Sequence, residues 1–202
     1  MAVHPHPPLQ NSRPHSKQQA TPTYAPQAGA TTGAAKTFAA LRLIVGGVFL
    51  WAFFDKAFGW GYATPAAKGW IDGGSPTKGF LSGVAAGPME STFHAWAGAP
   101  WANWLFMLGL LAIGATLTAG IALRFAAAAG TVMMALMWVA EWPPARHLSD
   151  GAPSMSSNPL LDYHLVYAAV LIALAVVCAG RTWGLGKVWE RLPFVRRNRW
   201  LL

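Results

Sequence analysis

The chain has 202 residues, of which 54% are hydrophobic and only 11% are charged, and its formal net charge is +8. Because about a quarter of the residues in a soluble domain are charged, this composition excludes an ordinary soluble enzyme and indicates a membrane protein. The basic residues lie at the chain ends beside apolar segments, a distribution that sets membrane topology, so we exclude nucleic acid as a partner. The single cysteine, Cys178, excludes an internal disulfide and any paired-cysteine motif.

The N-terminal region, residues 1–35, is rich in Pro, His, Gln, Ala and Thr. It contains no apolar stretch able to act as the core of a signal peptide, and its composition predicts a disordered tail. Its three histidines, His4, His6 and His15, could bind a metal ion. Without a fixed scaffold, however, a solvated tail is the favoured interpretation. We therefore predict no metal site.

Four apolar segments follow the tail, each close to the roughly 20 residues that cross the hydrocarbon of a bilayer. They lie at about residues 36–58, 101–123, 125–142 and 161–180. Only the surroundings of Arg124 separate the second from the third, and one continuous helix through both would far exceed the bilayer, so a reversal is predicted at 123–125. The sequence thus predicts an all-α membrane protein, an antiparallel bundle of four transmembrane helices within residues 36–180.

The loop at 59–100 is long for a compact bundle, so we expect it to carry structure. Ser75 as an N-cap and Pro76 in a first turn predict one short helix, and Pro88 predicts the start of a second. We expect these helices to lie at the membrane interface. Within the second transmembrane segment, small residues at Ala112, Thr116 and Gly120 recur every four positions and predict close helix packing.

The distribution of charge predicts the orientation. The side that holds both chain ends carries eleven basic residues and one acid, whereas the other side carries four bases and six acids. Since basic residues determine orientation, both termini are predicted to be cytoplasmic in a multi-pass protein of the plasma membrane. The C-terminal segment, 181–202, is basic and aromatic, which predicts contact with membrane lipid at the inner surface.

This orientation brings titratable residues of three helices to the outer end. Asp55 and Lys56 end the first segment, Glu141 ends the third, and Asp162 and His164 begin the fourth. Carboxylates and an imidazole at one membrane depth can exchange protons, so all four are candidate catalytic residues, and Lys56 can neutralise a carboxylate or bind an anionic substrate. The alternative, which the sequence leaves open, is that they are ordinary interface residues, with Asp162 placed favourably at a helix start.

Arg42 precedes Lys56 by fourteen residues, which is about 21 Å along a helix and leaves the two roughly 40° apart around its axis. This spacing predicts a polar face directed into the bundle and makes Arg42, with Lys56, a candidate substrate-binding residue. The equally open alternative is that Arg42 extends to the inner lipid head groups.

A family resemblance rests on five segments in a fixed order. They are LRLIVGGVFLWAFFDK, GGSPTKGFLS, the Trp-Pro-Pro that follows Glu141, NPLLDYH and RTWGLGKVWERLPFVRRN. The first has an Arg–Gly–Phe–Lys pattern at Arg42, Gly46, Phe49 and Lys56. Over residues 36–202 the chain resembles the DoxX/DoxD membrane family in its actinobacterial-type form. The best-known members of that family are subunits of thiosulfate:quinone oxidoreductase, which oxidises thiosulfate to tetrathionate and passes electrons to membrane quinone.

The resemblance implies a four-helix membrane protein with quinone as its cofactor, exchanging protons with Glu141 or His164. No sequence motif for haem, metal, flavin or an iron–sulfur cluster is present, so a second oxidoreductase subunit is the expected partner. The alternative function is a non-enzymatic scaffold or assembly subunit of a membrane redox or stress-response complex. Both functions stay open on the sequence.

Overall fold

The computed structural model describes residue 1 and residues 31–201. Over these residues the chain is helical, without a strand, and its only extended pairing is an isolated bridge between His147 and Pro153. The predicted all-α class is confirmed. The long helices are α1 (Thr31–Phe58), α4 (Pro100–Ala119), α5 (Leu123–Glu141) and α6 (Tyr163–Val176).

Three of the long helices, α1, α4 and α5, are long and apolar enough to cross a membrane. The fourth, α6, is apolar but has only 14 residues, about 21 Å at helical rise against roughly 30 Å of hydrocarbon. Large apolar side chains on the helix surfaces are exposed, among them Ile44 at 64% and Leu105 at 66%. Such surfaces are stable in lipid, so the helices indicate a membrane protein.

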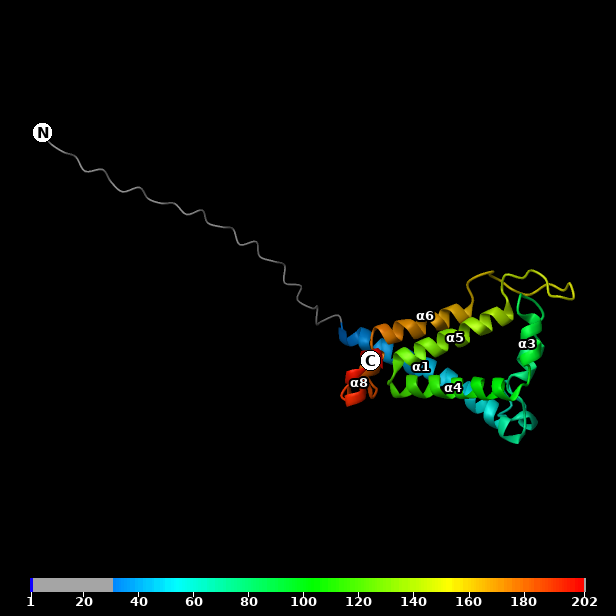
Figure 1. The fold of residues 1–202 in the computed structure, drawn as a ribbon, viewed down its shortest axis with the longest axis horizontal. Coiled ribbons are helices and arrows are strands. Elements are labelled where there is room, and N and C mark those ends of the chain that lie inside the picture. The colour runs from blue at the N-terminus through cyan, green and yellow to red at the C-terminus, as the bar shows by residue number, and fades with distance from the viewer. Residues whose placement is uncertain (2–30, 202) are drawn as a thin grey trace.

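Consecutive long helices lie side by side and run antiparallel (Figure 1). A Cβ added at Gly46 of α1 would lie 2.7 Å from Thr118 Oγ1, and one at Gly114 of α4 would lie 2.9 Å from the backbone nitrogen of Leu50. These two glycines bring α1 and α4 together, whereas Gly120 of the predicted small-residue stripe lies beyond the end of α4. The predicted stripe of small residues on α4 is therefore reduced to Ala112 and Thr116.

The turn between α4 and α5 lies at residues 120–122, just before the predicted reversal. Gly120 has φ 74° and donates its N–H to the carbonyls of Thr116 and Leu117. A left-handed residue ends a helix in this way, and glycine adopts that conformation without strain. The reversal is predicted around Arg124, the only interruption of the apolar run, but Arg124 lies in the first turn of α5. The left-handed glycine before it ends α4 and determines where the chain reverses.

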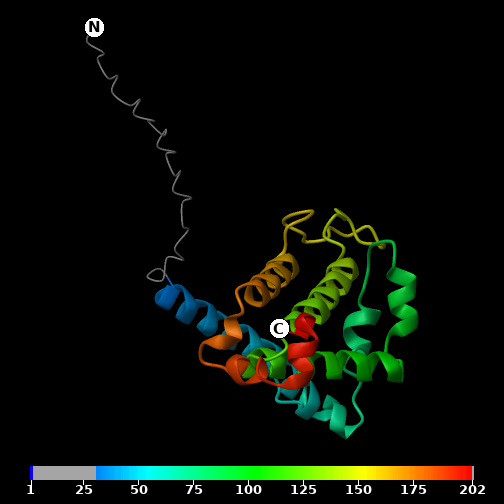
Figure 2. The same cartoon turned by 60° about the vertical axis from the view of Figure 1, so that its left-hand side comes forward.

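The C-terminal segment folds across the end of the bundle where α1 begins (Figure 2). It contains η3 (Ala179–Arg181), α7 (Gly186–Trp189), α8 (Pro193–Arg197) and η4 (Arg199–Leu201). Fully buried Arg42 holds this segment: Nη1 donates to the carbonyls of Leu117 and Thr118, and Nη2 donates to the carbonyl of Trp183 at 2.9 Å. The guanidinium thereby satisfies carbonyls at the end of α4, which have no partner within the helix.

The opposite end of the bundle carries the short helices expected in the loop at 59–100. They are η1 (Ala66–Lys68), η2 (Trp70–Asp72), α2 (Lys78–Ser82) and α3 (Glu90–Trp96). The predicted N-cap was wrong: Thr77 precedes α2, and the Ser75 hydroxyl instead donates to Asn103 Oδ1 at 3.1 Å. Phe93 and Trp96 of α3, together with Met89 just before that helix, pack against the end of α5.

The predicted disordered tail, residues 1–35, falls largely outside the described residues. Its last five residues are described and form the start of α1. The first long helix therefore begins at Thr31, before the predicted start near Lys36.

Candidate functional site: an Asp–His pair where α5 ends and α6 begins

The first residues of α6 position Asp162 and His164. Asp162 has an extended backbone and is the N-cap of the helix. Its Oδ1 accepts the backbone N–H groups of His164 at 3.0 Å and Leu165 at 3.3 Å. A capping carboxylate of this kind satisfies donors that the first helical turn leaves unpaired. Because Oδ1 is held by the backbone, Oδ2 is directed at the ring of His164.

The ring of His164 is buried and oriented from one side only. Asp162 Oδ2 lies 2.7 Å from Nδ1, the side chain is 1% exposed, and Nε2 has no hydrogen-bond partner among the described residues. A carboxylate at one ring nitrogen fixes the orientation of an imidazole and its proton on that side. Since buried polar atoms are normally paired, the unpaired Nε2 points to a ligand or water at this position.

Glu141 joins this site from the last position of α5. Its Oε1 accepts the hydroxyl of Tyr163 at 2.6 Å. Trp142 follows with φ 38° and ends the helix, and Pro143 cannot continue it. The Glu141–Tyr163 hydrogen bond therefore connects the end of α5 to the start of α6. Tyr163 is not among the site residues predicted from the sequence, although it lies between two that are, Asp162 and His164.

Glu141, Asp162 and His164 also carry atoms of the kind that bind metal ions. One oxygen of Glu141, one of Asp162 and one ring nitrogen of His164 lie within 4.8 Å of one another, a donor set that divalent ions accept. The Asp162–His164 hydrogen bond already joins two of these residues at 2.7 Å, so an ion bound between them would have to replace it. The geometry favours a shared proton over a preformed metal site.

A cavity of about 440 Å³ opens beside the pair. Its lining includes Glu141, Asp162 and Tyr163, together with Ser154, Ser156 and Asn158 of the loop that joins α5 to α6. Small-molecule sites have volumes on this scale. The two carboxylates therefore face an open cavity, whereas His164 is buried and does not contribute to its lining.

The other predicted site residues lie apart from this group. Asp55 is 1% exposed, and its two oxygens accept the backbone N–H groups of Tyr62 at 3.2 Å and Ala63 at 3.1 Å. Half-buried Lys56 makes no ion pair with any described residue. Arg42 lies at the opposite end of the helices. The contacts of Asp55 and Arg42 hold the chain in place, and their predicted roles in catalysis and substrate binding stay predictions, as does that of Lys56.

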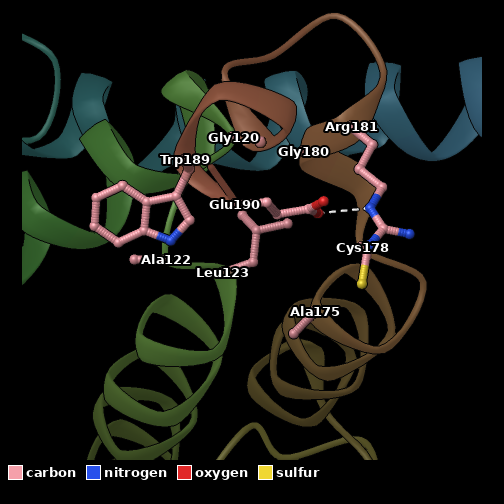
Figure 3. A pocket seen from close by; sticks show the side chains of 10 residues that line it. Gly120, Ala122, Leu123, Ala175, Cys178, Gly180, Arg181, Trp189 and Glu190 are labelled. Carbon is pink, nitrogen blue, oxygen red and sulfur yellow. Dashed lines mark hydrogen bonds and ion pairs between the residues drawn. The ribbon is translucent and has the colours of Figure 1, made fainter. Parts of the chain in front are cut away.

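A second cavity lies at the end of the helices that carries the C-terminal segment (Figure 3). Its volume is about 20 Å³, and Gly120, Gly180, Cys178 and Trp189 contribute to its lining. A cavity of this size holds a single water molecule. The cavity beside Asp162 is therefore the larger candidate site.

Glu141, Tyr163, Asp162 and His164 can hold protons at two neighbouring hydrogen bonds, one part-buried between Asp162 and His164 and one exposed between Tyr163 and Glu141. Such an arrangement can supply or remove a proton at Nε2 of His164. Comparisons with protein-family models, with curated proteins and with solved structures find no match to this chain.

Proposed function

We propose that the chain is an integral protein of the plasma membrane in which the Asp162–His164 pair exchanges protons with a membrane quinone. In this proposal α1, α4, α5 and α6 all cross the bilayer, and both termini are cytoplasmic. The observation that carries it is the buried His164 ring, held by Asp162 at 2.7 Å, with Nε2 unpaired among the described residues. The long apolar helices support the membrane location.

The reduction of a quinone to a quinol takes up two electrons and two protons. A protonated His164 can donate one proton from Nε2 to a quinone oxygen, and the Asp162 carboxylate stabilises the charged ring before transfer. The Tyr163–Glu141 pair borders the open cavity and can carry the second proton from water. Both pairs belong to the junction of α5 and α6, but of the two proton donors only the Tyr163–Glu141 pair lines the cavity. In this proposal the quinone therefore reaches the buried Nε2 of His164 from within the bundle.

The resemblance to the DoxX/DoxD family suggests thiosulfate as the electron donor. Two thiosulfate dianions join to form tetrathionate and release two electrons, which reduce one quinone. Lys56, in the last turn of α1, is the residue we propose attracts the dianion. A second oxidoreductase subunit completes the electron path in this proposal. Arg42 takes no part in it, because it lies fourteen residues before Lys56 on α1, beside the end of α4.

The first prediction concerns His164 in the full chain, purified in mild detergent with any co-purifying proteins and reconstituted with quinone. His164→Gln should lower thiosulfate-dependent quinone reduction by about 10²- to 10⁴-fold, the usual contribution of a positioned acid or base. The exposed His147 supplies the matched control, and His147→Gln should retain wild-type activity. The assay follows quinone absorbance, and quenching of tryptophan fluorescence reports quinone binding separately.

The outcome separates the two functions that the sequence leaves open. If the wild-type protein neither binds nor reduces quinone with its partners present, the quinone proposal fails. A scaffold role would then be favoured, provided that Glu141→Gln and Lys56→Met leave the cell phenotype intact while changes at helix contacts do not. Full activity in the His164→Gln variant would contradict the assignment of the site.

A further inference from the structure

The C-terminal segment is a folded surface, fixed at the end of the helices remote from the Asp162–His164 pair (Figures 1 and 2). The backbone N–H of Leu185 donates to the carbonyl of Ala119 at 2.8 Å, and Arg42 donates to Trp183. Val195 is fully buried. The side chains that this segment exposes are therefore held in defined positions.

Four exposed bases of this segment have no acidic partner among the described residues. Lys187, Arg191, Arg196 and Arg197 are all exposed and make no ion pair with a described residue. Glu190 is the only acidic residue after Asp162, and it is bound to Arg181 at 2.6 Å across the small cavity (Figure 3). This hydrogen bond raises the pKa of the Arg181 guanidinium. The remaining bases therefore present positive charge that nothing on the described surface neutralises.

Large apolar side chains lie among these bases. Trp183, Val188, Phe194 and Trp200 are each about half exposed. Tryptophan beside lysine and arginine is typical of the layer where hydrocarbon meets lipid head groups. The segment lies just beyond the end of the apolar helix α6, so a lipid surface is the partner that this combination of charge and apolar area favours.

In the proposed topology, in which α6 crosses the bilayer, its short length brings the segment to that depth. Only residues 177–180 separate the end of α6 from the segment at 181–202. With 14 residues that rise 1.5 Å each, α6 is about 9 Å shorter than the roughly 30 Å hydrocarbon layer. A spanning helix that is too short draws the residues at its ends toward the bilayer. The bases beyond it would then meet lipid phosphates.

We propose that the exposed bases Lys187, Arg191, Arg196 and Arg197, with the surrounding aromatic side chains, bind anionic phospholipid head groups of the inner leaflet. The phosphates accept hydrogen bonds from the guanidinium groups, and the aromatic rings enter the adjacent acyl layer. This inference needs the membrane location of the helices but does not depend on the quinone proposal.

The test measures lipid binding by the purified full chain with native mass spectrometry. Phosphatidylglycerol and phosphatidylethanolamine with the same acyl chains are titrated separately. The wild type should bind phosphatidylglycerol about tenfold more tightly, and the triple variant K187Q/R196Q/R197Q should lose most of this preference. The matched control is K68Q/K78Q/R146Q, which removes three exposed bases at the opposite end and should keep the preference.

A second measurement covers the case in which the triple variant does not fold. Raising the ionic strength should weaken the preference of the wild-type protein, because salt screens exposed charges. Equal binding of both lipids by the wild type would overturn the proposal, as would an unchanged preference in a folded triple variant or an equal loss in the control. A different partner would also overturn the proposal. This would be the outcome if the wild type and the control co-purified with an acidic protein or a nucleic acid, the triple variant did not, and all three had the same lipid preference.

Discussion

Asp162 joins two structural roles in one carboxylate. Oδ1 caps α6 by accepting two backbone N–H groups, and Oδ2 holds the ring of His164. An aspartate at an N-cap has a structural explanation by itself, and only the second contact connects it to chemistry. The two roles can be separated, because asparagine also caps helices well but carries no charge.

For Asp162, we therefore expect different effects from two substitutions. Asp162→Asn should change the free energy of unfolding by no more than a few tenths of a kcal/mol, whereas Asp162→Ala should lower it by about 1 kcal/mol through loss of the cap. Both should reduce quinone reduction, because neither can stabilise a protonated His164. Unfolding in detergent and the quinone assay measure the two effects. Equal stability of the Asn and Ala variants would show that the cap contributes little.

Two other buried charged residues, Arg42 and Asp55, have a structural explanation. A charged residue within a membrane-spanning helix is a functional-site candidate by default, and Arg42 and Asp55 meet that description. Each instead hydrogen-bonds to backbone groups: Asp55 accepts two N–H groups, and the Nη atoms of Arg42 donate to carbonyls, although its buried Nε has no partner among the described residues. In both cases the side chain secures a neighbouring segment of chain.

Among the elements, the pair α1 and α4 shows how glycine position controls helix contact. Gly46 and Gly47 are adjacent on α1, but only Gly46 faces α4. A Cβ at Gly46 would lie 2.7 Å from Thr118 Oγ1 and 3.0 Å from the Thr118 backbone nitrogen, whereas a Cβ at Gly47 would have no neighbour within 4 Å. Because lipid supplies no hydrophobic force between helices, such close contacts carry their association.

These neighbours provide a matched test of the helix contact. Gly46→Ala should destabilise the protein by about 1–3 kcal/mol, the typical effect of overpacking, while Gly47→Ala should be neutral or slightly stabilising because alanine favours a helix. Thermal unfolding in detergent measures both. A Gly47→Ala variant as unstable as Gly46→Ala would show that the α1–α4 contact lies on another face.

At the scale of the whole molecule, the ends of the bundle differ in chemistry. One end holds the start of α1 and the basic C-terminal segment, and the other holds the short helices, the Asp162–His164 pair and the loop between α5 and α6 (Figure 1). The proposed topology places the first end in the cytoplasm. With four crossings, both termini must lie on one side of the membrane.

The topology can be checked by cysteine labelling in intact cells. In a Cys178→Ser background, single cysteines replace Thr32, Ser149 or Asn198, all of which are exposed. A membrane-impermeant maleimide should label the cysteine at 149 before lysis and those at 32 and 198 only after lysis. Labelling of 32 and 198 on opposite sides would show an odd number of crossings. In that case α6, the shortest of the long helices, would not span the membrane.

The sequence by itself determined the helical class, the approximate helices and the side-by-side order of neighbours. Long apolar segments have few alternatives, since a backbone in lipid must satisfy its own hydrogen bonds, and short connections make consecutive helices antiparallel. The sequence also placed Glu141, Asp162 and His164 near one end, because helix ends at equal depth follow from segment lengths. It did not predict the reversal at Gly120. The chain turns there because Gly120 adopts a left-handed conformation that ends α4, whereas Arg124 lies within α5.

Only the tertiary structure decided which polar groups meet. The rotation of each helix about its axis depends on contacts such as Gly46 with Thr118, between residues far apart in the chain. That rotation directs Glu141 to Tyr163 and leaves Asp55 with backbone N–H groups. A carboxylate can be satisfied by a base, a hydroxyl or the backbone, and the residue type does not distinguish these partners. The choice follows from packing, which long-range contacts determine.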